Sequence, residues 1–203
     1  MFHHPLRCHC PLHETLCAEL VWEISNLLKV LQKRSGAEAG FARQIKNLGS
    51  PRRDLPQEPI HGEWRCSRRE PNASFGHCKT RHPGVVFEVC YSQKSRDIYR
   101  LADDYILGSD GSINAVVNIN IDYKVSKKAT FSVWRPTYHP KDGAVEFRST
   151  CVIKEQVSQS ICIYSRREAL RSSLVKRFSE QMMASHQVRQ RYDSHIRTSE
   201  LKG

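Results

Sequence analysis

Apolar residues recur with the spacing of an α-helix in two segments of this chain. Between Leu12 and Leu31 they return every three or four positions, and the pattern stops near Gly36. A second segment, Arg96–Leu107, repeats this spacing, and the residues on its apolar face are Ile98, Leu101, Ala102, Tyr105 and Ile106. The pattern therefore predicts two amphipathic helices, each with one face that packs against the rest of the protein.

Strand patterns lie on either side of the second helix. Val85–Tyr91 is a short, nearly continuous apolar run, which is typical of a buried strand. From Ile113 to Ile121 the odd-numbered positions are apolar while Asn118 and Asn120 fall between them, and this period of two indicates a strand. Strand, helix and strand in this order predict a βαβ unit with parallel strands and a right-handed crossover.

Weaker patterns extend this unit into a small sheet. Ala129–Trp134 is predicted to return antiparallel after a turn at 124–128. Shorter strand signals occur at 63–66, 145–147, 151–153 and 161–164. The expected fold class is therefore α/β, with a small mixed β-sheet and the two helices flanking it.

Glycine, proline and charge divide the chain into three parts. Residues 35–59 hold three glycines and three prolines among charged residues, which predicts loop with at most short elements. Residues 166–202 carry nine Lys or Arg against four Asp or Glu, with few large apolar residues. We expect an unstructured N-terminus at 1–11, one domain at 12–164, and a basic, poorly ordered tail at 165–203.

Net charge, the lengths of apolar runs and the cysteines indicate which partners the protein binds and where in the cell it is found. The 203 residues carry a net charge of +11, which favours a polyanionic partner such as nucleic acid, although a basic tail can also serve solubility alone. No apolar run is long enough for a membrane span, and the N-terminus lacks the apolar core of a signal peptide. Eight scattered cysteines without a C-x-x-C pair indicate reduced thiols. The protein is expected in the cytoplasm or nucleus, neither secreted nor bound to a membrane.

The block from Pro71 to Pro136 resembles the restriction-endonuclease-like superfamily, whose motif is P-D, a spacer and (D/E)-x-K. It is most similar to a bacterial branch of predicted endonucleases, in which the last motif reads E-V-apolar-S and a basic residue on the next helix replaces the lysine. The residues that carry the resemblance are Pro71-Asn72, Glu88-Val89-Cys90, Ser92, Gln93, Arg100 and Tyr105.

This resemblance implies a magnesium-dependent phosphodiester endonuclease. Glu88 and Asn72 would hold the Mg²⁺, which activates a water molecule and neutralises charge on the phosphorus. Arg100 would be the catalytic cation. The polar residues that would contact the nucleic acid are Gln93, Lys94 and Arg96.

The sequence departs from the family motif at two positions. Asn72 stands where the motif has aspartate, and a neutral amide is a poorer ligand for Mg²⁺ than a carboxylate. Cys90 stands at the strand lysine and is mostly uncharged at neutral pH at its ordinary pKa. We therefore expect a divergent nuclease-like domain that binds nucleic acid with weak or lost catalysis.

Simpler roles remain open for each of these residues. Glu88 could be a buried carboxylate paired with Arg100, and Asn72 could be a turn residue that caps the local backbone. The whole domain could then be a non-catalytic interaction scaffold. The histidines and cysteines between His3 and His13 could bind zinc, but their spacing fits no zinc finger. The pairs Tyr99/Arg100 and Trp134/Arg135 could stack on bases or simply pack in the core.

Overall fold

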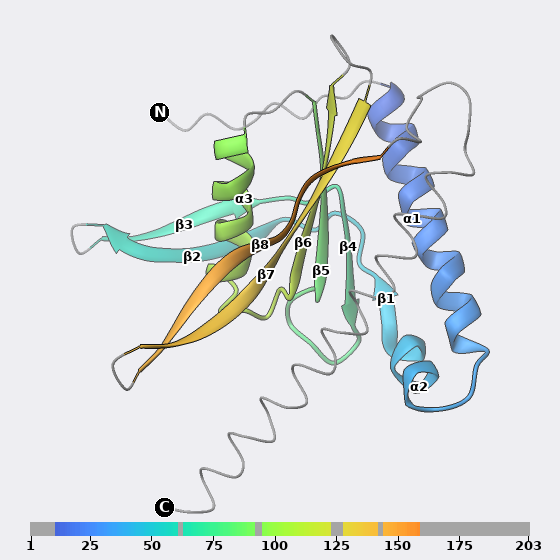
Figure 1. Cartoon of the computed structure of the whole chain (residues 1–203). Helices are drawn as coiled ribbons and strands as arrows, with labels where there is room; N and C mark the ends of the chain where they lie inside the picture. The colour runs from blue at the N-terminus through green and yellow to red at the C-terminus, as the bar shows by residue number, and fades with distance from the viewer. Residues whose placement is uncertain (1–10, 61–62, 92–94, 123–127, 142–143, 159–203) are drawn as a thin grey trace, which may run out of the picture.

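The computed structural model describes residues 11–60, 63–91, 95–122, 128–141 and 144–158. These residues form two β-sheets and three helices (Figure 1). The helices are α1 (Pro11–Gln32), α2 (Ala37–Gln44) and α3 (Ser95–Leu107). The strands are β1 (Ile45–Asn47), β2 (Arg53–Ile60), β3 (Glu63–Arg69), β4 (Ala73–His77), β5 (Val85–Tyr91), β6 (Ala115–Asp122), β7 (Lys128–Lys141) and β8 (Ala144–Ser158).

The main sheet is mixed and has the strand order β1-β4-β5-β6-β7-β8. Only β5 and β6 run parallel, from the pair Val85 and Ala115 to the pair Tyr91 and Ile121, and α3 connects them. The other neighbours in this sheet are antiparallel. The predicted parallel strands joined by a helix, and their antiparallel return, are confirmed, and the α/β class with flanking helices holds.

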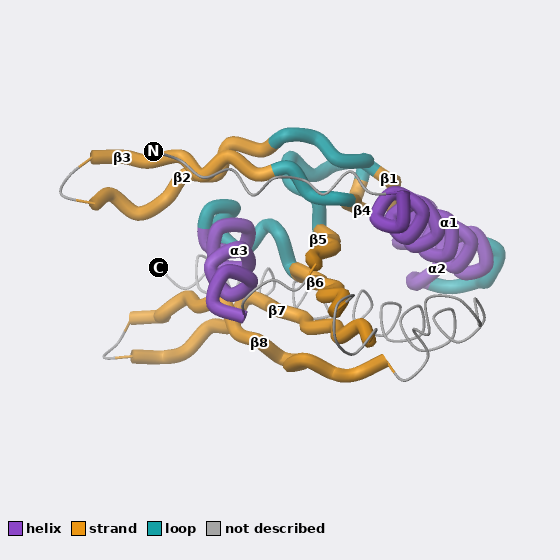
Figure 2. The backbone as a smooth tube through the Cα atoms, turned by 90° about the horizontal axis from the view of Figure 1, so that it is seen from above, coloured by secondary structure: helices purple, strands orange, loops and turns teal. Residues whose placement is uncertain are grey.

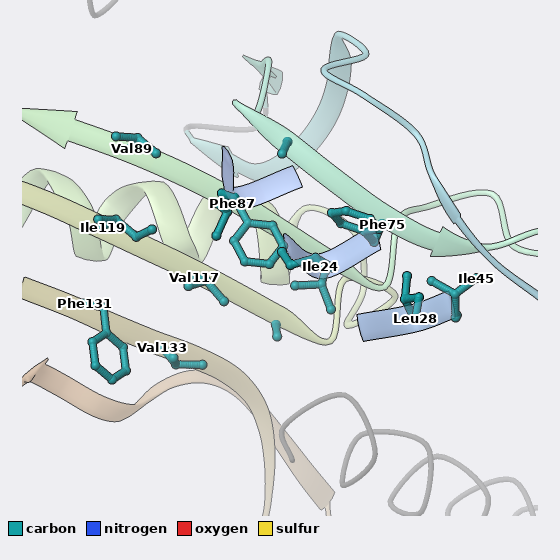
Figure 3. Close-up of a cluster of buried hydrophobic side chains, with 14 of the residues drawn as sticks. Ile24, Leu28, Ile45, Phe75, Phe87, Val89, Val117, Ile119, Phe131 and Val133 are labelled. Atoms are coloured by element: carbon teal, nitrogen blue, oxygen red, sulfur yellow. The ribbon is translucent and has the colours of Figure 1, made fainter. Parts of the chain in front are cut away.

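The two long helices cover opposite faces of this sheet (Figure 2). Successive residues of a strand point to opposite faces, so each strand serves both sides. On the α1 side the core contains Ile24 and Leu28 against Phe87, Val117 and other residues at odd positions of β5 and β6 (Figure 3). On the α3 side the apolar face of that helix packs on Val86, Val116 and Trp134. Even-numbered side chains of β5 and β6 therefore lie under α3.

Residues 35–59 contain more regular structure than the sequence predicts. They hold α2, β1 and most of β2. Pro56 and Pro59 lie within β2, where proline is usually excluded because it lacks a backbone donor. In the described part β2 pairs only with β3, so one side of the strand needs no donors, and the register shifts between Gln57 and Ile60.

Other boundaries also differ from the sequence-based expectation. The weak signals at 145–147 and 151–153 belong to one long strand, β8, which pairs with β7 along most of its length. Three of the expected segments lie outside the described residues: the N-terminus at 1–10, the strand at 161–164 and the tail at 165–203. Pro11, which was assigned to the unstructured N-terminus, is the first residue of α1. None of the described helices is long and apolar enough to cross a membrane.

The β2–β3 hairpin is a separate two-stranded sheet that is attached to α3. Asp104 of α3 is buried and accepts hydrogen bonds from Gln57 of β2 and from Ser67 and Arg69 of β3. Leu55 is fully buried in the core beneath α3. In both views this hairpin and the β7–β8 hairpin extend to the same side of the molecule (Figures 1 and 2), and Figure 2 shows α3 between them.

Candidate functional site

Glu88 points to the α3 side of the sheet, where its carboxylate meets a tyrosine. The hydroxyl of Tyr105 donates a hydrogen bond to Oε1 of Glu88 at 2.6 Å. Tyr105 is fully buried, and this short, charge-assisted bond satisfies its hydroxyl. Arg100 is exposed on α3, and no ion pair joins it to Glu88 in the part of the chain that the structure describes. The carboxylate on β5 is therefore bonded to Tyr105 and not to the arginine that the sequence suggested.

Asn72 uses both atoms of its side-chain amide within the protein. Its Oδ1 accepts a hydrogen bond from the backbone N–H of Val89 at 2.7 Å, so the side chain caps β5 beyond its pairing with β4. Its Nδ2 lies 3.0 Å from Nε2 of His13, a buried residue of α1. Because Oδ1 is fixed by Val89, Nδ2 is the donor, and Nε2 of His13 is the acceptor. Asn72 thus caps a backbone group, but on a strand 17 residues further along the chain and not within its own turn, as the simpler alternative had it.

The two expected metal ligands are bonded to different helices. Glu88 bonds to α3, whereas Asn72 bonds to α1. Mg²⁺ requires several hard oxygen ligands in near-octahedral geometry. No group of three or more His, Cys, Asp or Glu residues among the described ones could hold a metal ion. Among the described residues, neither Glu88 nor Asn72 thus belongs to a group that could hold Mg²⁺.

Cys90 cannot replace the positive charge of a lysine at this position. Its thiol accepts a hydrogen bond from Nδ2 of Asn118, a buried residue of β6, at 3.1 Å. Burial, and then the negative charge of Glu88, raise the pKa of the Cys90 thiol to about 12, and the Asn118 hydrogen bond opposes this only in part. Cys90 is therefore a neutral thiol at physiological pH.

The polar side chains under α3 form a stripe across three strands. Asn118 stands next to Glu88 on β6, and Ser132 of β7 stands opposite Asn118. Asn118 and Ser132 are both buried. The sequence signal for this stripe is the asparagines at even positions of the β6 pattern, but the partner of each polar group depends on the neighbouring strands and on α3.

The high pKa of Cys90 leads to a labelling prediction. Relative to an ordinary thiol pKa of 9.0, a value of about 12 lowers the thiolate fraction at mildly basic pH roughly a thousand-fold, and the thiolate is the reactive form. Iodoacetamide at pH 8, read out by peptide mass spectrometry, should label the exposed Cys66 and Cys78 much faster than Cys90. In urea the three rates should converge. Equal rates for Cys78 and Cys90 in the folded protein would contradict the burial of this thiol.

The remaining predicted residues are not gathered at Glu88. Gln93 and Lys94 lie outside the described residues, and Arg96 is exposed on α3, as Arg100 is. Trp134 packs in the core with 2% exposure, and the ring of Tyr99 stands nearly perpendicular to it, with the ring centroids 5.5 Å apart. Tyr99 itself is 38% exposed, so of the two aromatic rings only this one presents a surface to solvent.

Comparison with known proteins identifies no relative of this chain. No protein-family model, no curated protein and no solved structure matches this chain. The structure by itself defines an α/β protein with a six-stranded mixed sheet and helices on both faces. The resemblance to restriction-endonuclease-like proteins rests on the sequence motifs alone.

Proposed function

We propose that this chain is a restriction-endonuclease-like domain that binds nucleic acid and has lost metal-dependent phosphodiester cleavage. The main support for the loss of cleavage is that the Asn72 side chain is already bonded within the protein. Its amide oxygen accepts a hydrogen bond from the Val89 N–H, and its amide nitrogen donates one to His13. An oxygen that accepts a backbone hydrogen bond and lies on a group bonded to α1 is poorly available to an ion beside Glu88.

The chemistry of cleavage supports this proposal. Two carboxylates normally hold the ion that activates water and offsets the charge on the phosphate. Here Glu88 is the single carboxylate of the motif, and its partner is the Tyr105 hydroxyl. Cys90 is neutral and Arg100 is exposed on the helix, so neither of them supplies a buried cation at the site.

Charge supports a nucleic-acid partner. The whole chain carries +11, and a basic protein gains affinity for nucleic acid by releasing counterions from the phosphates. The described residues contain 19 Lys or Arg and 16 Asp or Glu, so most of the net charge lies in residues outside them. Binding experiments should therefore use the full chain.

A second candidate is a non-catalytic scaffold for protein interaction. The near balance of charge in the described residues favours it, as does the mutual bonding of the polar groups around Glu88 and Cys90. Such a protein would need neither a metal nor a phosphate ligand.

Fluorescence anisotropy with labelled single- and double-stranded oligonucleotides, combined with a cleavage assay in Mg²⁺ or Mn²⁺, tests these proposals. We expect binding that weakens steeply with salt and no cleavage, with the same affinity for Glu88→Gln. Asn72→Asp should also fail to cleave, because its carboxylate still bonds to the Val89 N–H. Metal-dependent cleavage that disappears in Glu88→Gln would refute the loss of catalysis. Absence of binding at low salt would favour the scaffold.

A further inference from the structure

A cluster of basic residues lies next to the start of β5, ahead of Val85 in the chain. Arg81 and His82 belong to the connection between β4 and β5, and Arg53 is the first residue of β2. Nη1 of Arg53 donates a long hydrogen bond of 3.4 Å to the carbonyl oxygen of Arg81, which brings the two segments together. We call these three residues the Arg53–Arg81–His82 cluster.

This cluster has no acidic partner among the described residues, unlike the two arginines at the end of β3. Arg68 pairs with Asp54 at 2.8 Å, and Arg69 pairs with Asp104. Asp54 follows Arg53 directly in β2, so its side chain points to the other face of the hairpin. The positive charge of Arg53 and Arg81 is therefore not neutralised locally.

Two nitrogen atoms of the cluster are buried and lack a hydrogen-bond partner. They are Nε of Arg53 and Nδ1 of His82. A buried polar nitrogen without a partner destabilises the protein unless water or a ligand supplies one. Burial, followed by the positive charges of Arg81 and Arg53, lowers the pKa of His82, so its ring is the neutral member of the cluster. The cluster therefore lacks both a counter-charge and acceptors.

The backbone that carries the cluster is well supported. Oγ1 of Thr80 lies 2.9 Å from the carbonyl oxygens of both His77 and His82, so its single hydroxyl proton is shared between them. Pro83 is buried against Gly76, where an added Cβ would lie only 3.0 Å from Cα of Pro83. The loop is thus fixed at both ends of the basic segment, so Arg81 and His82 are held next to β2.

We propose that Arg53, Arg81 and His82 form a binding site for a phosphate group. A tetrahedral oxyanion supplies the missing negative charge and several acceptors, and arginine forks bind phosphate oxygens in pairs. The inference deepens the proposed function by assigning a phosphodiester contact to the base of the β2–β3 hairpin. The same chemistry would bind inorganic phosphate or the phosphate of a small metabolite.

Titration with inorganic phosphate, followed by NMR of the histidine side chains, tests the site without nucleic acid. The ring signals of His82 should move to saturation at millimolar phosphate, and the pKa of His82 should rise because the anion stabilises the imidazolium. Chloride at matched ionic strength should not reproduce this. Arg81→Gln, an exposed position, should remove most of the shift, and Arg53→Lys should keep part of it.

Arg68→Gln is the matched control, because Arg68 is on the same hairpin but is already paired with Asp54. It should leave the phosphate titration unchanged. If His82 does not respond saturably to phosphate in the wild-type protein, or if Arg68→Gln weakens the response as much as Arg81→Gln, the site is refuted.

Oligonucleotide binding shows whether the bound phosphate belongs to a nucleic-acid backbone or to a small molecule. If the ligand is a nucleic-acid backbone, Arg81→Gln should reduce the slope of log affinity against log salt by about one, and Arg68→Gln should not. If inorganic phosphate binds but oligonucleotide affinity is the same in Arg81→Gln, the site stands as one for free or small-molecule phosphate. If the wild-type protein binds no oligonucleotide at all, the proposed nucleic-acid function fails, and this result is distinct from a failure of the phosphate site.

Discussion

Asp104→Ala is expected to lower the free energy of unfolding by about 3–5 kcal/mol, the scale for removing one partner of a buried ion pair. The carboxylate accepts hydrogen bonds from Gln57 at 2.6 Å, Ser67 at 2.9 Å and Nε of Arg69 at 2.8 Å. The Arg69 side chain is only 20% exposed, so alanine at 104 leaves a mostly buried cation without its counter-charge. Urea denaturation followed by circular dichroism measures the loss.

Asp54→Ala is the matched control for this substitution. It removes the ion pair with Arg68 on the same hairpin, but both side chains are more than half exposed, and exposed pairs contribute little to stability. Its urea midpoint should stay close to that of the wild-type protein. Similar losses for Asp54→Ala and Asp104→Ala would show that the hairpin is not held on α3 by Asp104.

Gly108→Ala should also destabilise the protein, by about 3 kcal/mol, at the upper end of the cost of overpacking. A Cβ at this position would lie 2.8 Å from Cβ of Leu55 and 2.9 Å from the carbonyl oxygen of Pro56. It would also lie 2.5 Å from the carbonyl oxygen of Asp104. Neither the buried Leu55 nor the two backbone groups can move freely, so α3 and β2 must separate. Thermal denaturation compares the variants.

Gly40→Ala provides the control for introducing the same methyl group. Gly40 lies within α2, and apart from its chain neighbours and the helix's own backbone no described heavy atom lies within 4 Å of its added Cβ. Alanine there should increase stability by about 0.5–1 kcal/mol, because alanine favours the helix over glycine. A Gly108→Ala protein as stable as the Gly40→Ala protein would mean that the contact between α3 and β2 is loose.

The central elements could be predicted because their patterns are strong. Val85–Tyr91 is a nearly continuous apolar run whose predicted bounds coincide with those of β5, and the apolar face of α3 was evident from its spacing. The β2 strand could not be predicted, because Pro56 and Pro59 argue against a strand unless it stands outside the main sheet. That placement is a property of the tertiary fold.

The candidate site was predictable only in part, for the same reason. Glu88 attracts attention in the sequence because a carboxylate in a buried strand requires a partner. Both Arg100 and Tyr105 lie on the following helix, and only the packing of α3 brings the tyrosine hydroxyl to the carboxylate. The contact between Asn72 and His13 joins residues 59 positions apart and has no local signal.

The β2–β3 hairpin leaves and rejoins the main sheet at nearly the same place. It is inserted between β1 and β4, which are neighbours in the sheet, and Ser74 closes its base through bonds to Leu48 and Gly49. Since its ladder is separate from that of the six strands, the hairpin can detach from α3 as one cooperative unit while the main sheet stays folded. Detachment would break the bond between Arg53 and Arg81. By linkage, a phosphate that binds both arginines would hold the hairpin closed, and a looser hairpin would bind phosphate more weakly.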